Sequence, residues 1–124
     1  MKVGDFMKKV VVIDSDVSLK DAAKLMSKHR IGSLVQVKGD NILGILTERD
    51  IVKNIPKINH KMSKVMSKKV LSIDLNEPLD VAAELMAKNK IKRLLVTEKG
   101  KLSGIISATD IIANSDCLNE FDFF

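Results

Sequence analysis

The feature that most constrains this chain is an internal repeat with a period of 60 residues. Matching pairs include Ile13 and Ile73, Ala22 and Ala82, Leu34 and Leu94, and Asp50 and Asp110. Upstream the correspondence shifts by one residue, so that Met7 corresponds to Met66. Because a repeat of this kind is one supersecondary unit written twice, we expect two copies of one fold at residues 1–60 and 61–115, followed by a C-terminal tail at 116–124.

Each copy predicts the order strand, helix, strand, strand, helix. In the first copy a β-branched run at residues 10–13 is typical of a strand. Ser18 and Asp21 have the spacing of a capping box that opens a helix, and Gly32 is expected to end it. Two further strands at 34–37 and 42–46 and a helix at 50–54 complete the copy. The predicted fold class is α+β, with two pseudo-symmetric β-α-β-β-α repeats packed through their sheets.

Both copies end their last strand with one motif, at residues 44–51 and 104–111. It consists of a glycine, an apolar pair, a hydroxyl residue (Thr47 or Ser107) and, three positions later, Asp50 or Asp110. The hydroxyl is expected at a helix N-cap, beside free N–H groups that favour an anion. The same spacing fits a capping box in which the aspartate only closes the helix end. The residues alone leave both interpretations open.

Composition narrows the class of protein. Hydrophobic residues make up 45% and charged residues 30% of the 124 positions, which is typical of soluble globular chains. No apolar run approaches the roughly 20 residues that span a bilayer, and the first residues lack a signal-peptide pattern. A single cysteine, Cys117, suits a reducing compartment, so we expect a cytoplasmic protein without a membrane partner. A half of about 60 residues is marginal by itself, so the halves are expected to share a core.

The two copies together resemble a tandem pair of CBS domains, also called a Bateman module. The resemblance covers residues 3 to 114 and has several components. They are the leading Val-Gly-Asp-Phe-Met and Met-Ser-Lys-Val-Met segments, the Ala-Ala-x-Leu-Met helices, the Ile-Gly-Ser-Leu-Val strand opening and the repeated Gly-apolar-x-Thr/Ser-x-x-Asp motif.

This resemblance implies a regulatory or sensor module rather than an enzyme. Such modules bind adenosine-containing ligands such as AMP, ADP, ATP or S-adenosylmethionine in clefts between the repeats and signal occupancy to a partner. It implies no catalytic cofactor, and it suggests a homodimer and an effector protein of unknown identity. A carboxylate that accepts from the two ribose hydroxyls is reasonable chemistry for the repeated aspartate.

The resemblance also implies two sets of binding residues. One cleft would be formed by Asp5, Val10, Ile31, Gly32, Ile105, Ser107 and Asp110. The pseudo-symmetric cleft would be formed by Ile45, Thr47, Asp50, Ser63, Val70, Ile91 and Lys92. Arg49 and Arg93 are the candidates to meet phosphates.

Two other functions stay open on the sequence. The net charge of +5 and the calculated pI near 9.4 would suit a nucleic-acid-binding protein using the same cleft, although aromatic residues make up only 3% of the chain. A purely structural dimerisation module would need the repeated motif only as a cap. His29 and His60 have no partner at metal-ligand spacing, so no metal site is expected. The three phenylalanines of the tail are expected to dock on the module or on a second subunit.

Overall fold

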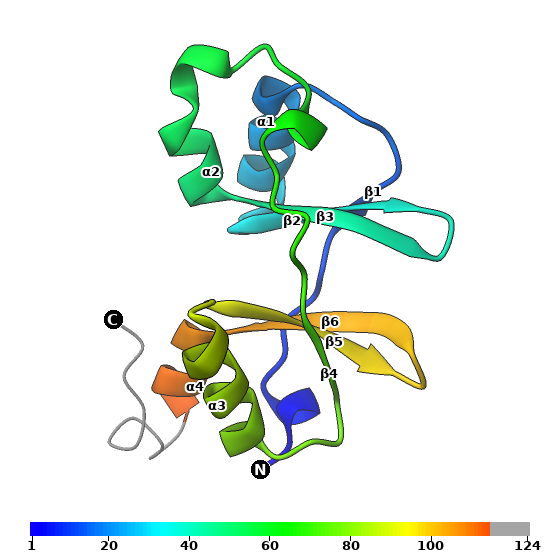
Figure 1. Ribbon diagram of the computed structural model, residues 1–124, viewed down its shortest axis with the longest axis vertical. Helices are drawn as coiled ribbons and strands as arrows, with labels where there is room; N and C mark the ends of the chain where they lie inside the picture. The colour runs from blue at the N-terminus through cyan, green and yellow to red at the C-terminus, as the bar shows by residue number, and fades with distance from the viewer. Residues whose placement is uncertain (115–124) are drawn as a thin grey trace. The chain divides into compact units, whose positions relative to one another are not determined.

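The chain forms two compact units in its computed structural model, which describes residues 1–114 (Figure 1). The first unit is Val10–Val70, and the second consists of Met1–Lys9 together with the chain from Leu71 onward. The predicted tail at 116–124, with Cys117 and three phenylalanines, lies outside the described residues.

The first unit is a three-stranded sheet with two helices on one face (Figure 1). Its elements are β1 (Val12–Ile13), α1 (Leu19–His29), β2 (Ser33–Lys38), β3 (Asn41–Thr47) and α2 (Glu48–Lys53). The strand order is β1-β2-β3, with β1 parallel and β3 antiparallel to the central β2.

The second unit repeats this arrangement. Its elements are β4 (Ser72–Asp74), α3 (Leu79–Asn89), β5 (Arg93–Glu98), β6 (Lys101–Ser107) and α4 (Ala108–Asn114). The strand order is β4-β5-β6, and a bulge interrupts the antiparallel pair at the position equivalent to the one in the first unit. The predicted α+β class and the β-α-β-β-α order of both repeats are confirmed.

The predicted end of the first helix is wrong. Gly32 was expected to stop it, but α1 ends at His29 and Arg30 takes the left-handed conformation, with φ of 55°. The N–H groups of Arg30 and Ile31 both bond the carbonyl of Met26, which closes the helix without a glycine. Lys90, with φ of 54°, does the same after α3, so the repeat preserves the geometry although neither copy has the usual residue.

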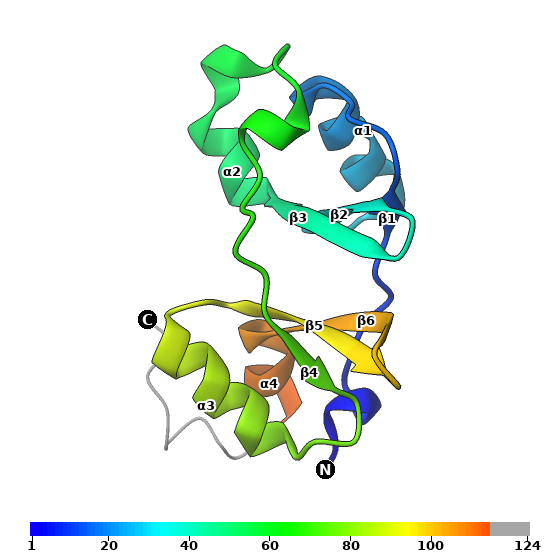
Figure 2. The same cartoon turned by 45° about the vertical axis from the view of Figure 1, so that its right-hand side comes forward.

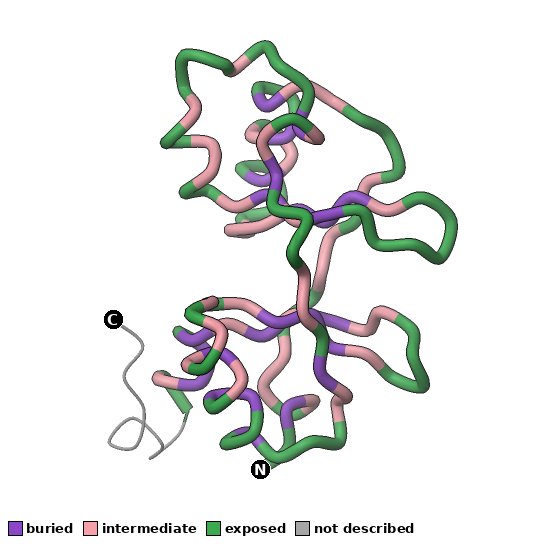
Figure 3. The backbone as a smooth tube through the Cα atoms, in the orientation of Figure 1, coloured by how far each residue is buried: buried purple, intermediate pink, exposed green. Residues whose placement is uncertain are grey.

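Each unit buries a hydrophobic cluster of its own (Figure 3). The buried members in the first unit are Leu19, Ala22, Met26, Leu34, Leu46, Met62 and Met66. Those in the second unit are Val3, Ile73, Leu79, Ala82, Ala83, Met86, Leu94, Val96, Ile106, Ala108 and Ile111. Each unit thus has a cluster of its own, in which the repeated methionines occupy packing positions.

The compact units do not coincide with the sequence repeats. The segment at the start of each repeat packs in the unit formed by the rest of the other repeat. Val3 is buried in the second unit, where its N–H bonds the carbonyl of Glu77. Met62 is buried in the first unit, where its N–H bonds the carbonyl of Val17. Both segments appear in Figure 2, in blue at the start of the chain and in green ahead of β4.

The exchanged segments also run beside the last strands of the sheets. Ser67 and Ile45 exchange two backbone hydrogen bonds of 2.9 Å, and Lys8 and Ile105 exchange bonds of 2.8 and 3.0 Å. The strand glycines allow this approach. A Cβ added to Gly44 would lie 2.7 Å from the carbonyl oxygen of Ser67, and one added to Gly104 would lie 2.7 Å from a methionine sulfur. The glycine of the repeated motif is thus required by packing.

Residues 1–114 include no helix that is long and apolar enough to cross a membrane.

Substituting these strand glycines should destabilise the protein. Gly44→Ala is expected to lower the free energy of unfolding by about 1–3 kcal/mol, because the new methyl group meets backbone that cannot rotate away. Urea unfolding followed by circular dichroism measures the change. Ser103→Ala, one residue before Gly104 on β6, is the control and should change stability by less than about 0.5 kcal/mol. Equal stability of the two variants would show that the segment does not approach the strand this closely.

Candidate functional site

The first hydroxyl–aspartate motif joins β3 to α2. Thr47 has extended backbone, and its Oγ1 accepts a hydrogen bond of 3.3 Å from the N–H of Asp50. In return, Oδ2 of Asp50 accepts from the Thr47 N–H at 2.9 Å and from the Thr47 hydroxyl at 3.0 Å. The motif is therefore a complete capping box. Asp50 is half-buried, and its Oδ1 takes no part in the cap.

The second motif joins β6 to α4 with nearly the same geometry. Oδ2 of Asp110 accepts from the N–H and the hydroxyl of Ser107, both at 2.9 Å, and the Asp110 N–H donates to the Ser107 hydroxyl at 3.2 Å. Asn54 and Asn114 each bond the backbone carbonyl of the aspartate four residues earlier. The sequence prediction that both motifs cap helices is confirmed. A capped carboxylate still keeps acceptor capacity on its other oxygen.

Some of the helix N–H groups expected to face an anion have partners within the protein. In α2 the first N–H group, of Glu48, bonds the carbonyl of Gly32 at 3.0 Å, and the third, of Asp50, bonds Thr47. In α4 the N–H of Ala108 bonds the carbonyl of Lys92 at 2.8 Å. The residue before β2 or β5 and the cap thus use the first and third of these donors.

Sequence reasoning missed one contact of the second motif. The ammonium of Lys8 lies 3.0 Å from Oδ1 of Asp110, the oxygen that the cap leaves unused. The Asp110 side chain is only 6% exposed, whereas the Lys8 side chain is 74% exposed. A buried carboxylate needs such a partner to remain charged at low cost. The sequence offers one hint of a difference at this position. Because Met7 aligns with Met66, Lys8 corresponds to Ser67 in the repeat.

Ser63, predicted as a ligand contact, is held by Asp16 in the first unit. Its hydroxyl donates to Oδ2 of Asp16, and its N–H donates to Oδ1 at 3.0 Å. Gln36 adds a third donor to Oδ1 at 3.3 Å. The hydrogen bond from the Ser63 hydroxyl is the main cause that lowers the pKa of the Asp16 carboxyl below its ordinary value, with the Ser63 N–H and Gln36 acting in the same direction.

The remaining predicted residues divide between the two units. The first unit contains Val10, Ile31, Gly32, Ile45, Thr47, Arg49, Asp50, Ser63 and Val70. The second unit contains Asp5, Ile91, Lys92, Arg93, Ile105, Ser107 and Asp110. Each motif is thus brought together with the apolar residue two positions before its hydroxyl. Asp5 is exposed, and its carboxylate accepts from the N–H of Lys2 at 3.1 Å.

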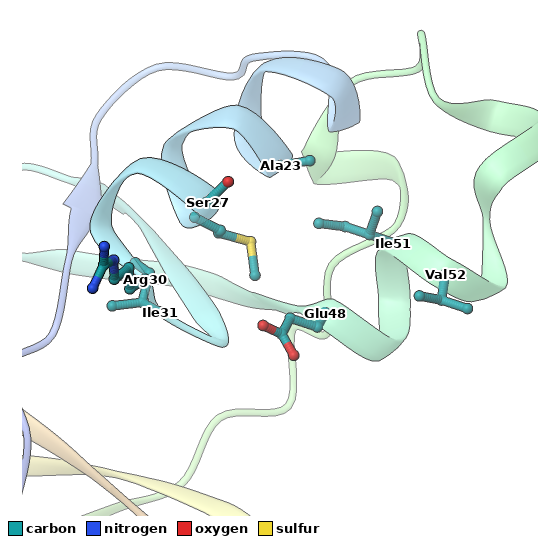
Figure 4. A pocket seen from close by; sticks show the side chains of 8 residues that line it. Ala23, Ser27, Arg30, Ile31, Glu48, Ile51 and Val52 are labelled. Atoms are coloured by element: carbon teal, nitrogen blue, oxygen red, sulfur yellow. The ribbon is translucent and has the colours of Figure 1, made fainter.

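A groove of about 420 Å³ lies between α1 and α2 in the first unit (Figure 4). Its lining residues are Ala23, Met26, Ser27, Arg30, Ile31, Glu48, Ile51 and Val52. Ile31 is the one predicted binding residue among them. Glu48 and Ile51 of the motif line the groove, whereas its hydroxyl and carboxylate residues, Thr47 and Asp50, do not.

Histidine and carboxylate side chains do not cluster in the part of the chain that the structure describes. Within residues 1–114, no group of three or more His, Cys, Asp or Glu residues could hold a metal ion. His29 and His60 are both exposed.

Comparison with known proteins identifies the family. Residues 3–57 and 62–116 each match the CBS domain, so the chain belongs to the CBS-domain family as a tandem pair. It is similar to the CBS domain pair of protein MJ0100, solved in complex with 5′-methylthioadenosine and S-adenosyl-L-methionine. That structure is 28% identical, with a TM-score of 0.81 over 91% of this chain and 94% of the other.

Two curated relatives show where such a pair occurs. An uncharacterized protein of Methanocaldococcus jannaschii is 35% identical over 114 residues, which is 90% of this chain and 38% of that protein. Inosine-5′-monophosphate dehydrogenase of Thermoplasma acidophilum is 36% identical over 104 residues, which is 83% of this chain and 21% of the enzyme. This chain spans between 38% and 65% of the length of the three curated relatives that it matches first.

Removing the Ser63 hydroxyl should raise the pKa of Asp16. Because the folded-state pKa of Asp16 is lowered, its contribution to stability is present above the unfolded value of about 3.9 and is lost as the pH falls through the folded-state value. We expect Ser63→Ala to be less stable than wild type at pH 7, with the difference vanishing near pH 2. Urea unfolding at both pH values measures this effect.

The exposed serine Ser27 provides the control for that comparison. Ser27→Ala should show the same difference from wild type at both pH values. A Ser63→Ala deficit that persists unchanged in acid would show that Asp16 is not the partner of Ser63 in solution.

Proposed function

We propose that this CBS pair is a regulatory module that binds an adenosine-containing ligand at its hydroxyl–aspartate motifs. The observation that carries the proposal is the state of the two aspartates. Each is fixed by the cap through Oδ2, while Oδ1 takes no part in the cap; in Asp110 this oxygen faces the exposed ammonium of Lys8. A rigid carboxylate with one oxygen available suits a pair of ribose hydroxyls, which are donors at neighbouring carbons.

The ligand class follows from the complex of the similar MJ0100 pair, in which both bound compounds contain adenosine. Adenosine is common to both compounds. The motif would therefore recognise the ribose, and the apolar residue that precedes the hydroxyl would contact the base. Ile45 and Ile105 are half-buried and are followed two residues later by the hydroxyl. The family resemblance also assigns residues of the other repeat to each motif. We propose that these residues contact the same ligand.

Signalling is the second part of the proposal. A ligand that binds one conformation of the module better than another shifts the population toward that conformation, and a partner can sense the change. Inosine-5′-monophosphate dehydrogenase carries a similar region as about a fifth of its length. We therefore propose that the module acts as a homodimer in the cytoplasm and regulates an effector protein.

Loss of either aspartate should remove binding at its motif. Asp50→Ala and Asp110→Ala are each expected to lower the ligand affinity of their own motif by at least about tenfold, since hydrogen bonds to a charged group contribute about 1.5–3 kcal/mol each. The double variant should bind no adenosine compound. Isothermal titration with 5′-methylthioadenosine, S-adenosylmethionine, AMP, ADP and ATP measures these affinities.

Each substitution also removes a cap, so a matched cap variant is needed. Ser18 caps α1 by accepting from the N–H of Asp21 at 3.1 Å, away from both motifs. Ser18→Ala costs a similar cap, about 1 kcal/mol, and should leave every affinity unchanged. If both aspartate variants bind like wild type, the motifs serve only as caps, and the dimerisation or nucleic-acid alternatives take precedence.

A further inference from the structure

The two motifs share their backbone and cap geometry but differ in the side chain beside the aspartate. In the second unit Lys8 pairs with Ile105 on β6 and places its ammonium 3.0 Å from Asp110. In the first unit Ser67 pairs with Ile45 on β3 through the same two backbone bonds. Ser67 thus holds the position of Lys8 without a charge. Its hydroxyl donates instead to the carbonyl of Lys69, at 3.4 Å.

A second position differs in the same direction. Arg93 is the register partner of the motif hydroxyl Ser107 across the β5–β6 pair. Its equivalent, Ser33, is the register partner of Thr47 across the β2–β3 pair. Directly paired residues of antiparallel strands project from the same face of the sheet. Arginine therefore stands beside one hydroxyl, and serine stands beside the other.

The helix side of the motifs does not cancel this difference. Glu48 and Arg49, in the first turn of α2, are adjacent and of opposite charge. Ala108 and Thr109, in the same places of α4, are uncharged. Among the positions compared, Lys8 and Arg93 are cations that only the second motif has, while Arg49, next to Glu48, is a cation that only the first motif has.

The Lys8 ammonium can serve the aspartate and a ligand together. An ammonium has three donors, and the ion pair with Asp110 uses one of them. The side chain is mostly exposed, so the remaining donors stay accessible beside the carboxylate oxygen that would accept a ribose hydroxyl. The backbone donors of Ala108 and Asp110 are already used by the protein, so the side-chain cations Lys8 and Arg93 are candidates to meet an anionic group.

We propose that Lys8 makes the Ser107–Asp110 motif selective for adenosine ligands that carry a phosphate, with Arg93 assisting. The Thr47–Asp50 motif, with Ser67 and Ser33 in their places, lacks this preference and accepts uncharged adenosine compounds equally well. This inference rests on the proposed function, because it assigns a ligand class to each of its two motifs. Lys8 is thus a specificity-determining residue at the second motif.

The test compares AMP with adenosine, which differ only in the phosphate, at one motif at a time. Asp50→Ala isolates the second motif, and there AMP should bind about tenfold more tightly than adenosine, as expected for one charged hydrogen bond. Adding Lys8→Ser should reduce that ratio to near one. Isothermal titration at low and high salt measures both ligands, and the AMP preference should weaken with salt.

The reciprocal variant covers the case in which Lys8→Ser fails to fold. In the Asp110→Ala background the ratio should be near one, and Ser67→Lys should raise it toward the value of the second motif. The inference would be overturned if Lys8→Ser left the ratio of AMP affinity to adenosine affinity unchanged. It would also be overturned if Ser67→Lys did not raise that ratio.

The outcomes also separate this inference from the proposed function. If both compounds bind the wild type and binding depends on the aspartates, but neither exchange alters the ratio, only the role of Lys8 is refuted. If wild type binds neither compound, the proposed function and the inference fall together.

Discussion

The pairing of an exchanged segment with the last strand of each sheet is the contact on which both units depend. Two backbone hydrogen bonds join Ile45 to Ser67, and two join Ile105 to Lys8. They require a strand without side-chain bulk at Gly44 and Gly104, where any Cβ would collide with the segment. The same pairing places the residue that follows Met7 or Met66, which is Lys8 or Ser67, beside the motif. Packing and the chemistry of the candidate site therefore have one structural cause.

The capping box and the proposed ribose contact use different oxygens of one carboxylate. Fixing Oδ2 through the N-cap residue removes rotational freedom from Asp50 and Asp110 before any ligand arrives, and such preorganisation lowers the cost of binding. The arrangement explains why a capping interpretation and a binding interpretation of the motif need not exclude each other. It also explains why sequence spacing alone could not choose between them.

Much of the fold followed from local sequence patterns, because hydrophobic periodicity, turn residues and caps act within a few positions. The strands, the helices and both reciprocal caps are examples. The Lys8–Asp110 pair was not predictable in this way, since it depends on which distant segment lies beside β6. The Arg30 helix end was missed because a left-handed arginine is uncommon, and here the N–H groups of Arg30 and Ile31 close the helix through the Met26 carbonyl.

The exchange of segments has a consequence for the order in which the chain can fold during synthesis. All of the first unit lies between Val10 and Val70, so it can close as soon as that stretch has left the ribosome. The second unit needs Met1–Lys9, made before the whole of the first unit, and β6, made after it. Residues 1–9 thus remain without their partner strand while the first unit closes, and an alteration in them is felt first in the second unit.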